Sequence, residues 1–486
     1  MTDNLGRKVL SGLLWSTIQS WGGKLATLAL FAILARLLDS HSFGVFASAM
    51  AVLAFVTIFV DQGLSEAIVQ RPSVTPQLLN TAFFVNLVLS VLVFAVLWVT
   101  SPFIAKYMKI LELTNILRAA SVCVLLTALG FSQQAMQRRN FHYRWLAICS
   151  VSSTIVSGVC GTILAFSGYG AWSLVIQILI NALMNSALLW VRSQWRFSFE
   201  FDFAGVRGLF SYGINKLGAQ LLDFGNTRYL EIYLAVNLGA AALGCYLVGV
   251  KIYQALMQAL SGAVLDVAHS GFSRIAHDKD ELARVYYKAI TLTSAVAVPV
   301  FVLLACVAPE VTVIVFGKRW ESSAAIMQPM ALLGAVQALQ FYNGTVYNAL
   351  GKPSIGLVFL VFKTIVTCLA LVLTHGMGLQ SVVWWYAFGQ IITAPPSFIL
   401  VQLLVGISLR KIAMRIWPFL VACAVAAGGV WLIRAGEWIV QWTPFFRLLF
   451  LSSTGLLIYS TITILFAKNH IEEVMAVFKG RRPATS

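Results

Sequence analysis

The chain has 486 residues, of which 59% are hydrophobic and 11% are charged, and its formal net charge is +16. Soluble domains contain about 25% charged residues, so this composition excludes a soluble globular, disordered, collagen-like or disulfide-stabilised protein. No Asp, Glu, Lys or Arg lies between Arg144 and Arg192, or between Lys363 and Arg410. Because about 20 apolar residues cross a bilayer as a helix, each stretch has room for two spans and a turn. The sequence predicts an all-α, polytopic membrane protein.

Apolar runs bounded by charges, glycines or prolines predict about 14 transmembrane helices. In chain order they lie near residues 11–36, 43–62, 79–101, 114–135, 145–166, 171–191, 208–234, 240–266, 289–308, 323–350, 355–375, 379–405, 413–433 and 445–467. The first run, from Val9 to Ala35, is longer than the apolar region of about 7–15 residues in a signal peptide. We therefore interpret it as an uncleaved span. No soluble domain fits between the spans.

The positions of Lys and Arg predict the orientation in the membrane, because basic loops stay on the cytoplasmic side. If the N-terminus is inside, the cytoplasmic loops and tails hold 21 basic residues and the outer loops hold 8. We therefore expect a multi-pass protein of the cytoplasmic (inner) membrane with both termini in the cytoplasm. The net positive charge then reflects membrane topology, and nucleic acid is not an expected partner.

The first six spans share landmarks with the next six. Three short segments recur in the same order with similar offsets: 43–46 with 243–246, 134–136 with 348–350, and 168–170 with 376–378. A repeat of six spans is even, so its two halves run parallel across the membrane. We expect an N-lobe of spans 1–6, a cytoplasmic linker, a C-lobe of spans 7–12, and a last part with spans 13–14 and a cytoplasmic tail: residues 1–192, 193–207, 208–405 and 406–486.

The chain resembles the polysaccharide flippases of the MOP superfamily, of the Wzx type that includes the colanic-acid exporters. The segments that carry the resemblance are 35–38 (ARLL) followed by Phe43-Gly44, 272–274 (FSR), 316–320 (FGKRW) and 349–353 (ALGKP). Ser270 stands where the family has a proline, which puts only the local turn in doubt. The resemblance implies a two-lobed transporter that moves an undecaprenyl-diphosphate-linked oligosaccharide to the outer leaflet, for the synthesis of exopolysaccharide or lipopolysaccharide. Its partners would be membrane lipids, polysaccharide polymerases and glycosyltransferases.

Charged side chains at membrane depth usually face a cavity or a partner. In the seventh span, Lys216, Gln220, Asp223, Thr227 and Glu231 lie within about 80° of one another on a helical wheel. Further polar stripes with a lysine occur in the eighth and eleventh spans. We predict a basic, hydrated cavity for a diphosphate and its glycan, lined by Lys24, Lys216, Arg228, Lys251, Lys363, Gln220, Gln254 and Gln258. Alternatively, Lys216, Asp223, Arg228 and Glu231 neutralise one another within the seventh span.

Four acidic residues are candidates for binding a coupling cation or proton: Asp61, Asp223, Glu231 and Asp266. Asp61 and Asp266 lie at the cytoplasmic ends of their spans, where an acidic residue more often marks the membrane interface. The seven cysteines are scattered singly without a C-x-x-C pair, so we expect neither a metal nor a cofactor.

The segment Asp278-Lys279-Asp280 matches the D-x-D pattern of enzymes that use nucleotide sugars. It lies in a loop without an α/β domain to hold a nucleotide, and it is better placed to begin the helix leading into the ninth span. We therefore expect a transporter and not an enzyme. The alternatives are a membrane glycosyltransferase or polysaccharide polymerase, and a cation or drug antiporter of the same fold.

Overall fold

The computed structural model describes residues 24–61, 65, 68–69, 71, 74–193, 195–200, 202–436, 439 and 441–466. Side chains at 61, 203–216, 219 and 262–270 are outside this description. Within the described ranges, all the regular secondary structure is helical. The all-α membrane architecture predicted from the sequence is therefore confirmed.

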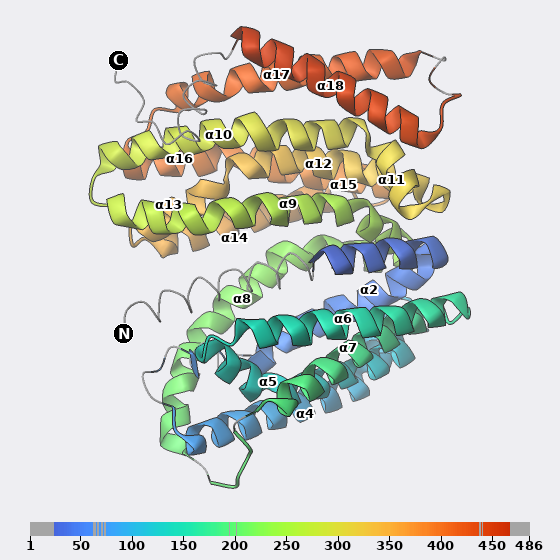
Figure 1. Ribbon diagram of the computed structural model, residues 1–486, viewed down its shortest axis with the longest axis vertical. Helices are drawn as coiled ribbons and strands as arrows, with labels where there is room; N and C mark the ends of the chain where they lie inside the picture. The colour runs from blue at the N-terminus through green and yellow to red at the C-terminus, as the bar shows by residue number, and fades with distance from the viewer. Residues whose placement is uncertain are drawn as a thin grey trace. The chain divides into compact units, whose positions relative to one another are not determined.

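The helices follow one another with short connections (Figure 1). Residues 24–37 are helical and precede α2. The labelled elements are α2 (Ser40–Asp61), α4 (Pro76–Tyr107), α5 (Leu113–Arg139), α6 (Tyr143–Phe166), α7 (Ala171–Val191), α8 (Phe203–Asn237), α9 (Gly239–Ile275), α10 (Lys279–Cys306), α11 (Ala308–Phe316), the 3-10 helix η1 (Lys318–Ser323), α12 (Ala324–Leu339), α13 (Phe341–Ala349), α14 (Pro353–Val372), α15 (Leu379–Ile392), α16 (Ala394–Val405), α17 (Leu409–Ala435) and α18 (Pro444–Phe466).

Twelve helical segments of the described chain are long and apolar enough to cross a membrane. The expected number was 14. The seventh expected span lies within α8, which is not one of the twelve, and the first is described only from residue 24 onward. Two of the twelve contain an interruption, at Gln340 between α12 and α13 and at Thr393 between α15 and α16. Pro395 and Pro396 explain the second interruption, because proline lacks the amide hydrogen that would continue a helix but fits its first turn.

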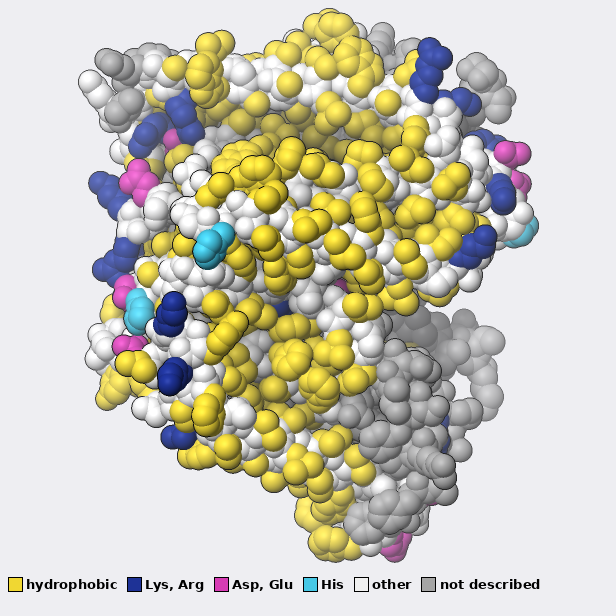
Figure 2. Space-filling model, turned by 180° about the vertical axis from the view of Figure 1, so that it is seen from behind, with side chains coloured by type: hydrophobic (Ala, Val, Ile, Leu, Met, Phe, Trp, Pro, Cys, Tyr) yellow, Lys and Arg dark blue, Asp and Glu magenta, His cyan; other side chains and the backbone are white. Residues whose placement is uncertain are grey.

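The surface has the amphipathic character that a bilayer requires. In the upper half of the view in Figure 2, apolar side chains cover most of the face drawn, whereas Lys and Arg gather toward its left and right ends. Large apolar side chains in the middle of helices are exposed, for example Val88 and Val99 of α4 and Leu369 of α14. Exposed apolar residues of this kind contact lipid tails in a membrane protein.

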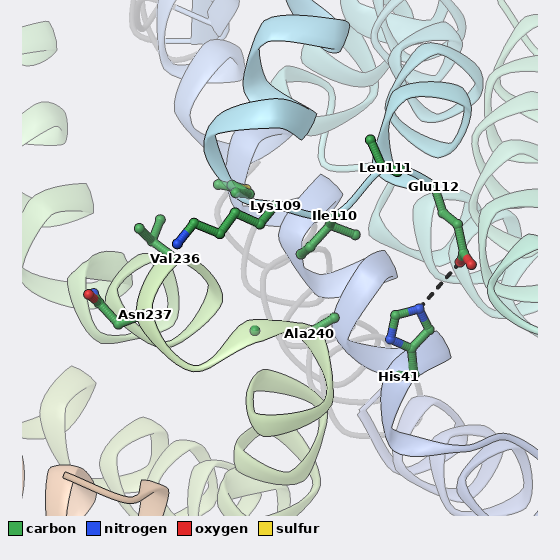
Figure 3. A pocket seen from close by; sticks show the side chains of 10 residues that line it. His41, Lys109, Ile110, Leu111, Glu112, Val236, Asn237 and Ala240 are labelled. Carbon is green, nitrogen blue, oxygen red and sulfur yellow. Dashed lines mark ion pairs between the residues drawn. The ribbon is translucent and has the colours of Figure 1, made fainter. Parts of the chain in front are cut away.

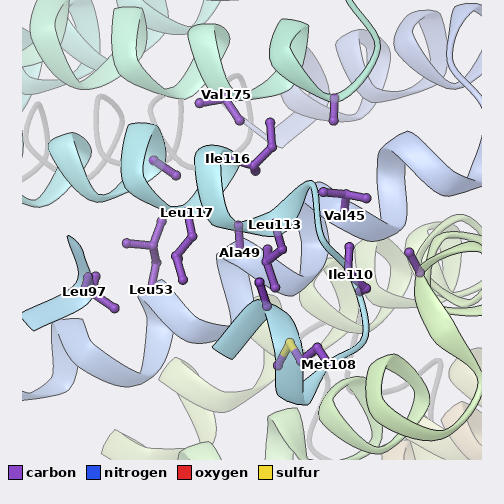
Figure 4. Packing of buried hydrophobic residues seen from close by; sticks show 14 of the residues in the cluster. Val45, Ala49, Leu53, Leu97, Met108, Ile110, Leu113, Ile116, Leu117 and Val175 are labelled. Carbon is purple, nitrogen blue, oxygen red and sulfur yellow. The ribbon is translucent and has the colours of Figure 1, made fainter. Parts of the chain in front are cut away.

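The chain forms two compact units, Met1–Leu247 and Val248–Ser486. In the first unit, α5 packs against α4 and α7, and α6 packs against α7, while α8 packs against α2 and α4. Figure 4 shows the apolar core of this unit, where Val45, Ala49 and Leu53 of α2 meet Leu113 and Leu117 of α5. The lobe boundary at residues 193–207 stays a prediction from the repeat.

The segment before α8 is held on α4 by a dense set of contacts. The Ser198 backbone amide donates to Asn80 Oδ1 (3.1 Å), and Asn80 Nδ2 donates to Ser198 Oγ (2.7 Å). The Asp202 amide donates to Thr81 Oγ1 (2.7 Å). The Phe83 and Phe197 rings are stacked with centroids 6.1 Å apart. These contacts position the N-terminal end of α8 beside α4.

In the second unit, α10 packs against α12 and α17, and α17 packs against α18 (Figure 1). Asp278 is the N-cap of α10: one carboxylate oxygen accepts from the amides of Asp280 and Glu281, both at 3.0 Å. The prediction that this acidic segment begins a helix is therefore confirmed. Tyr459 of α18 donates to the backbone oxygen of Ala295 in α10 (2.7 Å), which ties the last helix to the unit.

Candidate functional site

The polar residues of α8 include a close ion pair. Arg228 Nη1 lies 2.8 Å from both carboxylate oxygens of Glu231, three residues later on the same helix. Glu231 is 5% exposed, whereas the Arg228 side chain is 42% exposed. The structure thus joins a predicted substrate-binding residue and a predicted coupling residue. This contact supports the alternative in which these two charges balance each other.

The described side chains of the other predicted residues of α8 form different contacts from this pair. Asp223 is exposed, and Thr227 Oγ1 donates to the Asp223 backbone oxygen (2.8 Å) within the helix. Gln220 is half-buried, and its Oε1 atom is buried without a hydrogen-bond partner among the described residues. The side chain of Lys216 lies outside the described residues, as do those of Asp61 in α2 and Asp266 in α9.

The predicted residues of α9 follow one side of that helix. Lys251 and Gln254 are half-buried and Gln258 is exposed, and the spacing of three and four residues places them on one face. Tyr253 is buried, and its hydroxyl donates to Gln337 Oε1 in α12 (2.6 Å). This bond holds the Tyr253 side of α9 on α12. Lys251 is two residues earlier in the helix, so it lies on the opposite side of α9.

Lys363 of α14 is a charged residue in the middle of an apolar helix. It is half-buried in a helix that is apolar enough to cross the membrane. No carboxylate of the described part of the chain forms an ion pair with it within 4 Å. A cation in such a position normally faces a cavity or an anionic partner. This property singles out Lys363 as a candidate ligand for an anionic substrate.

One turn after Lys363, Thr367 of the predicted polar stripe bonds to a buried side chain, Gln390, that sequence reasoning missed. Thr367 Oγ1 donates to the Lys363 backbone oxygen (2.8 Å) and accepts from Gln390 Nε2 of α15 (3.2 Å). Gln390 is 3% exposed, and its Oε1 atom has no partner among the described residues. Gln390 is one of three glutamines in the predicted span 379–405, and the sequence does not indicate which of them pairs with Thr367.

The predicted residues are distributed over both units. Arg228 and Gln220 belong to the first unit, whereas Lys251, Gln254 and Lys363 belong to the second. Lys24, in the helix before α2, is exposed. The expectation that the three stripes line one cavity therefore stays a prediction.

A family model described as "polysaccharide biosynthesis protein" matches residues 33–325. The chain belongs to this family. The matched segment includes α8 and the stripe of α9, whereas Lys24 and Lys363 lie outside it. The resemblance to polysaccharide flippases drawn from the sequence motifs agrees with this membership.

Curated relatives of this polysaccharide biosynthesis protein match it over most of their length. The teichuronic acid biosynthesis protein TuaB of Bacillus subtilis is 24% identical over 87% of this chain and 88% of the relative. The lipopolysaccharide biosynthesis protein WzxC of Escherichia coli is 23% identical over 86% of each chain. The succinoglycan biosynthesis transport protein ExoT of Rhizobium meliloti is 24% identical over 68% of this chain and 66% of the relative.

Two solved structures share the fold of this chain over most of its length. The lipid II flippase MurJ in an inward closed conformation superposes with a TM-score of 0.76 and 13% identity, over 94% of this chain and all of that one. An inward-facing multidrug resistance transporter of the MATE family, from the MOP superfamily, gives a TM-score of 0.59 and 14% identity over 79% and 94% of the two chains. At these identities the likeness shows the fold alone. It confirms the all-α, polytopic membrane fold of this polysaccharide biosynthesis protein.

Proposed function

We propose that this protein is a flippase that moves an undecaprenyl-diphosphate-linked oligosaccharide across the cytoplasmic membrane by alternating access, for polysaccharide export. The family membership and the names of the relatives support a role in making a surface polysaccharide. The name of one relative includes transport, and the fold occurs in a lipid II flippase. The structural observation that carries the proposal is Lys363, a half-buried cation in a membrane helix.

The chemistry of Lys363 suits the polar part of such a cargo. A diphosphate is strongly anionic and cannot cross an apolar layer without compensation. A lysine ammonium compensates phosphate as a compact point charge with three hydrogen-bond donors. Lys251 of α9 supplies a second charge of the same sign on another helix of the second unit. The lipid tail needs no protein compensation, because it stays in the bilayer.

The proposed location is the inner membrane with both termini in the cytoplasm, which the excess of Lys and Arg in the cytoplasmic loops supports. The protein would take its cargo from membrane glycosyltransferases and release it to a polysaccharide polymerase. The two alternatives have less support. Asp278 serves as a helix cap, which accounts for the D-x-D segment without an enzyme. Half-buried lysines would repel the cationic substrate of a drug antiporter.

The test is a flipping measurement with purified protein in proteoliposomes that contain a lipid-linked oligosaccharide. An impermeant glycosidase added outside reports how fast glycan reaches the outer leaflet. We expect protein-dependent exposure of the glycan, reduced in Lys363→Gln and reduced further in Lys363→Glu. Lys352→Glu is the matched control, because Lys352 is exposed in the connection before α14.

Two results would contradict the proposal. If the wild-type protein does not accelerate glycan exposure, the chain is not a flippase for this cargo. If Lys363→Glu flips at the wild-type rate, the basic site is wrong even though the family membership stands. Resistance to cationic drugs conferred by the wild-type protein would favour the antiporter alternative.

A further inference from the structure

Two glycines bring the backbones of α2 and α9 into direct contact. A Cβ atom on Gly44 of α2 would lie 1.7 Å from the backbone oxygen of Ala240. A Cβ atom on Gly244 of α9 would lie 1.9 Å from the backbone oxygen of Ser40. No side chain fits at such distances, so only glycine permits this approach. Both contacts lie inside the first compact unit.

The two contacts are reciprocal in a way that reflects the internal repeat. Gly44 and Gly244 are 200 residues apart, and so are their contact partners Ser40 and Ala240. Each glycine therefore packs on the residue four positions before its own repeat equivalent. This is the pattern of a local two-fold axis, in which the same patch of each element meets the other. The first turns of α2 and α9 form a self-complementary joint.

The surroundings of this joint are apolar and closely packed. Phe43, Leu243 and Ala240 are 1%, 0% and 5% exposed, respectively. The two helices approach each other through backbone atoms at Gly44 and Gly244. Such packing of small residues holds membrane helices together largely by van der Waals attraction. A joint of this kind is tight when it is closed. It also separates without leaving a buried charge unpaired, which would be costly.

A hollow of about 330 Å³ lies beside the joint (Figure 3). Its walls come from the start of α2, the connection between α4 and α5, and the junction of α8 and α9. His41 Nε2 lies 3.4 Å from Glu112 Oε2 across one side of it. The α8–α9 junction is short and turns at Gly239, whose φ of +83° favours glycine. The first turn of α9 thus borders open space on the side of the α4–α5 connection.

We propose that the Gly44–Gly244 joint is the outer gate of the transporter, closed while cargo loads and separated when the glycan leaves. This inference rests on the proposed function and on the predicted topology, in which α2 and α9 both begin at the outer face. Alternating access requires one contact at that face that is tight when made and is broken in each cycle. The reciprocal glycine joint meets both requirements, because the two backbones meet directly and their contact is non-ionic.

The first test adds a methyl group at each side of the joint. Gly44→Ala and Gly244→Ala should prevent full closure, whereas Gly428→Ala in α17 is the matched control, because a Cβ there meets nothing within 4 Å. The readout is labelling of Ala240→Cys by an impermeant maleimide in a variant whose native cysteines are replaced. We expect several-fold faster labelling with either joint variant and no change with Gly428→Ala. Equal labelling in all three would overturn the proposal.

The second test locks the joint without altering either glycine. Ser40→Cys and Ala240→Cys are joined by a short, reducible bifunctional thiol reagent, and flipping is measured before and after reduction. We expect cross-linking to abolish flipping and reduction to restore it, while each single variant treated with the reagent stays active. A cross-linked protein that flips at the uncross-linked rate would overturn the gate. Failure of the untreated protein to flip would instead contradict the proposed function, and the labelling test would still decide the gate.

Discussion

Glu310 of α11 and Arg434 of α17 form an ion pair that connects the last two helices to the rest of the second unit. Glu310 is 4% exposed and the Arg434 side chain is 30% exposed. The two residues are 124 positions apart. A second polar bond from α17 to α10 lies near the other end of α17, where Arg415 Nη1 donates to Thr291 Oγ1 (3.4 Å). Polar bonds as well as packing therefore hold α17 on α11 and α10.

Removing one member of this ion pair should destabilise the protein. Arg434→Met leaves the Glu310 carboxylate buried without compensation, at a cost of about 3–5 kcal/mol. Adding Glu310→Gln should recover part of that loss, because the uncompensated charge disappears. Thermal unfolding in detergent measures the effect. Lys411→Met, an exposed residue of the same helix, is the control. Equal unfolding temperatures for Arg434→Met and Lys411→Met would show that the pair contributes nothing.

Reversing the charge of Lys251 should harm transport more than removing it. Like charges a few ångströms apart repel by about 1 kcal/mol or more, which corresponds to about a fivefold lower rate. We therefore expect export to decrease in the order wild type, Lys251→Gln, Lys251→Glu at equal protein levels. Export of polysaccharide from cells measures this order. Normal export by both Lys251→Glu and Lys363→Glu would refute the basic-cavity mechanism.

Arg228 and Glu231 should behave as a coupled pair. Their contact at 2.8 Å predicts that Arg228→Gln lowers export by leaving the buried Glu231 carboxylate uncompensated. Glu231→Gln in the same chain should restore part of the loss, which a double-mutant cycle detects. Additive losses would instead mean that Arg228 has an independent role, such as direct contact with the cargo.

Asp278 should contribute to stability in a pH-dependent way that is unrelated to transport. The Glu281 and Asp280 backbone amides donate to its carboxylate and hold the pKa of Asp278 below its usual value. A lowered folded-state pKa means that the stabilisation is present above the unfolded pKa of about 3.9 and is lost as pH falls through the folded pKa. The stability difference between wild type and Asp278→Ala should accordingly shrink below about pH 4, as measured by thermal unfolding.

The same segment distinguishes a transporter from an enzyme. Because Asp278 acts as a helix cap and asparagine is an equally good cap, Asp278→Asn with Asp280→Asn should leave export largely intact. Loss of all product at normal protein abundance would favour the glycosyltransferase alternative.

Reporter fusions test the orientation on which the outer gate depends. Fusions after Ser193 and Asp278 should report the cytoplasm, and fusions near Lys318 should report the outside. An external reporter at Asp278 would contradict the even number of spans and the parallel repeat.

The sequence alone determined the membrane class, the approximate position of nearly every helix and the start of α10. These properties depend on local features: the length of an apolar run, the placement of charges, and capping residues such as Asp278. The repeat offset of 200 residues between Gly44 and Gly244 was also visible, because it needs only the order of residues. The helix signals lie in neighbouring positions, and the repeat needs only a comparison of short segments.

Only the tertiary structure decided which distant residues meet. Hydropathy places Glu310 and Arg434 at the ends of two helices, but it carries no information that the two ends are adjacent. In the same way, Gln390 became a candidate only through its bond to Thr367 beside Lys363. The reason for a glycine at position 44 is its close approach to Ala240, which is visible only once the two helices are packed together. Such contacts depend on how whole helices fit together, which is a property of many residues at once.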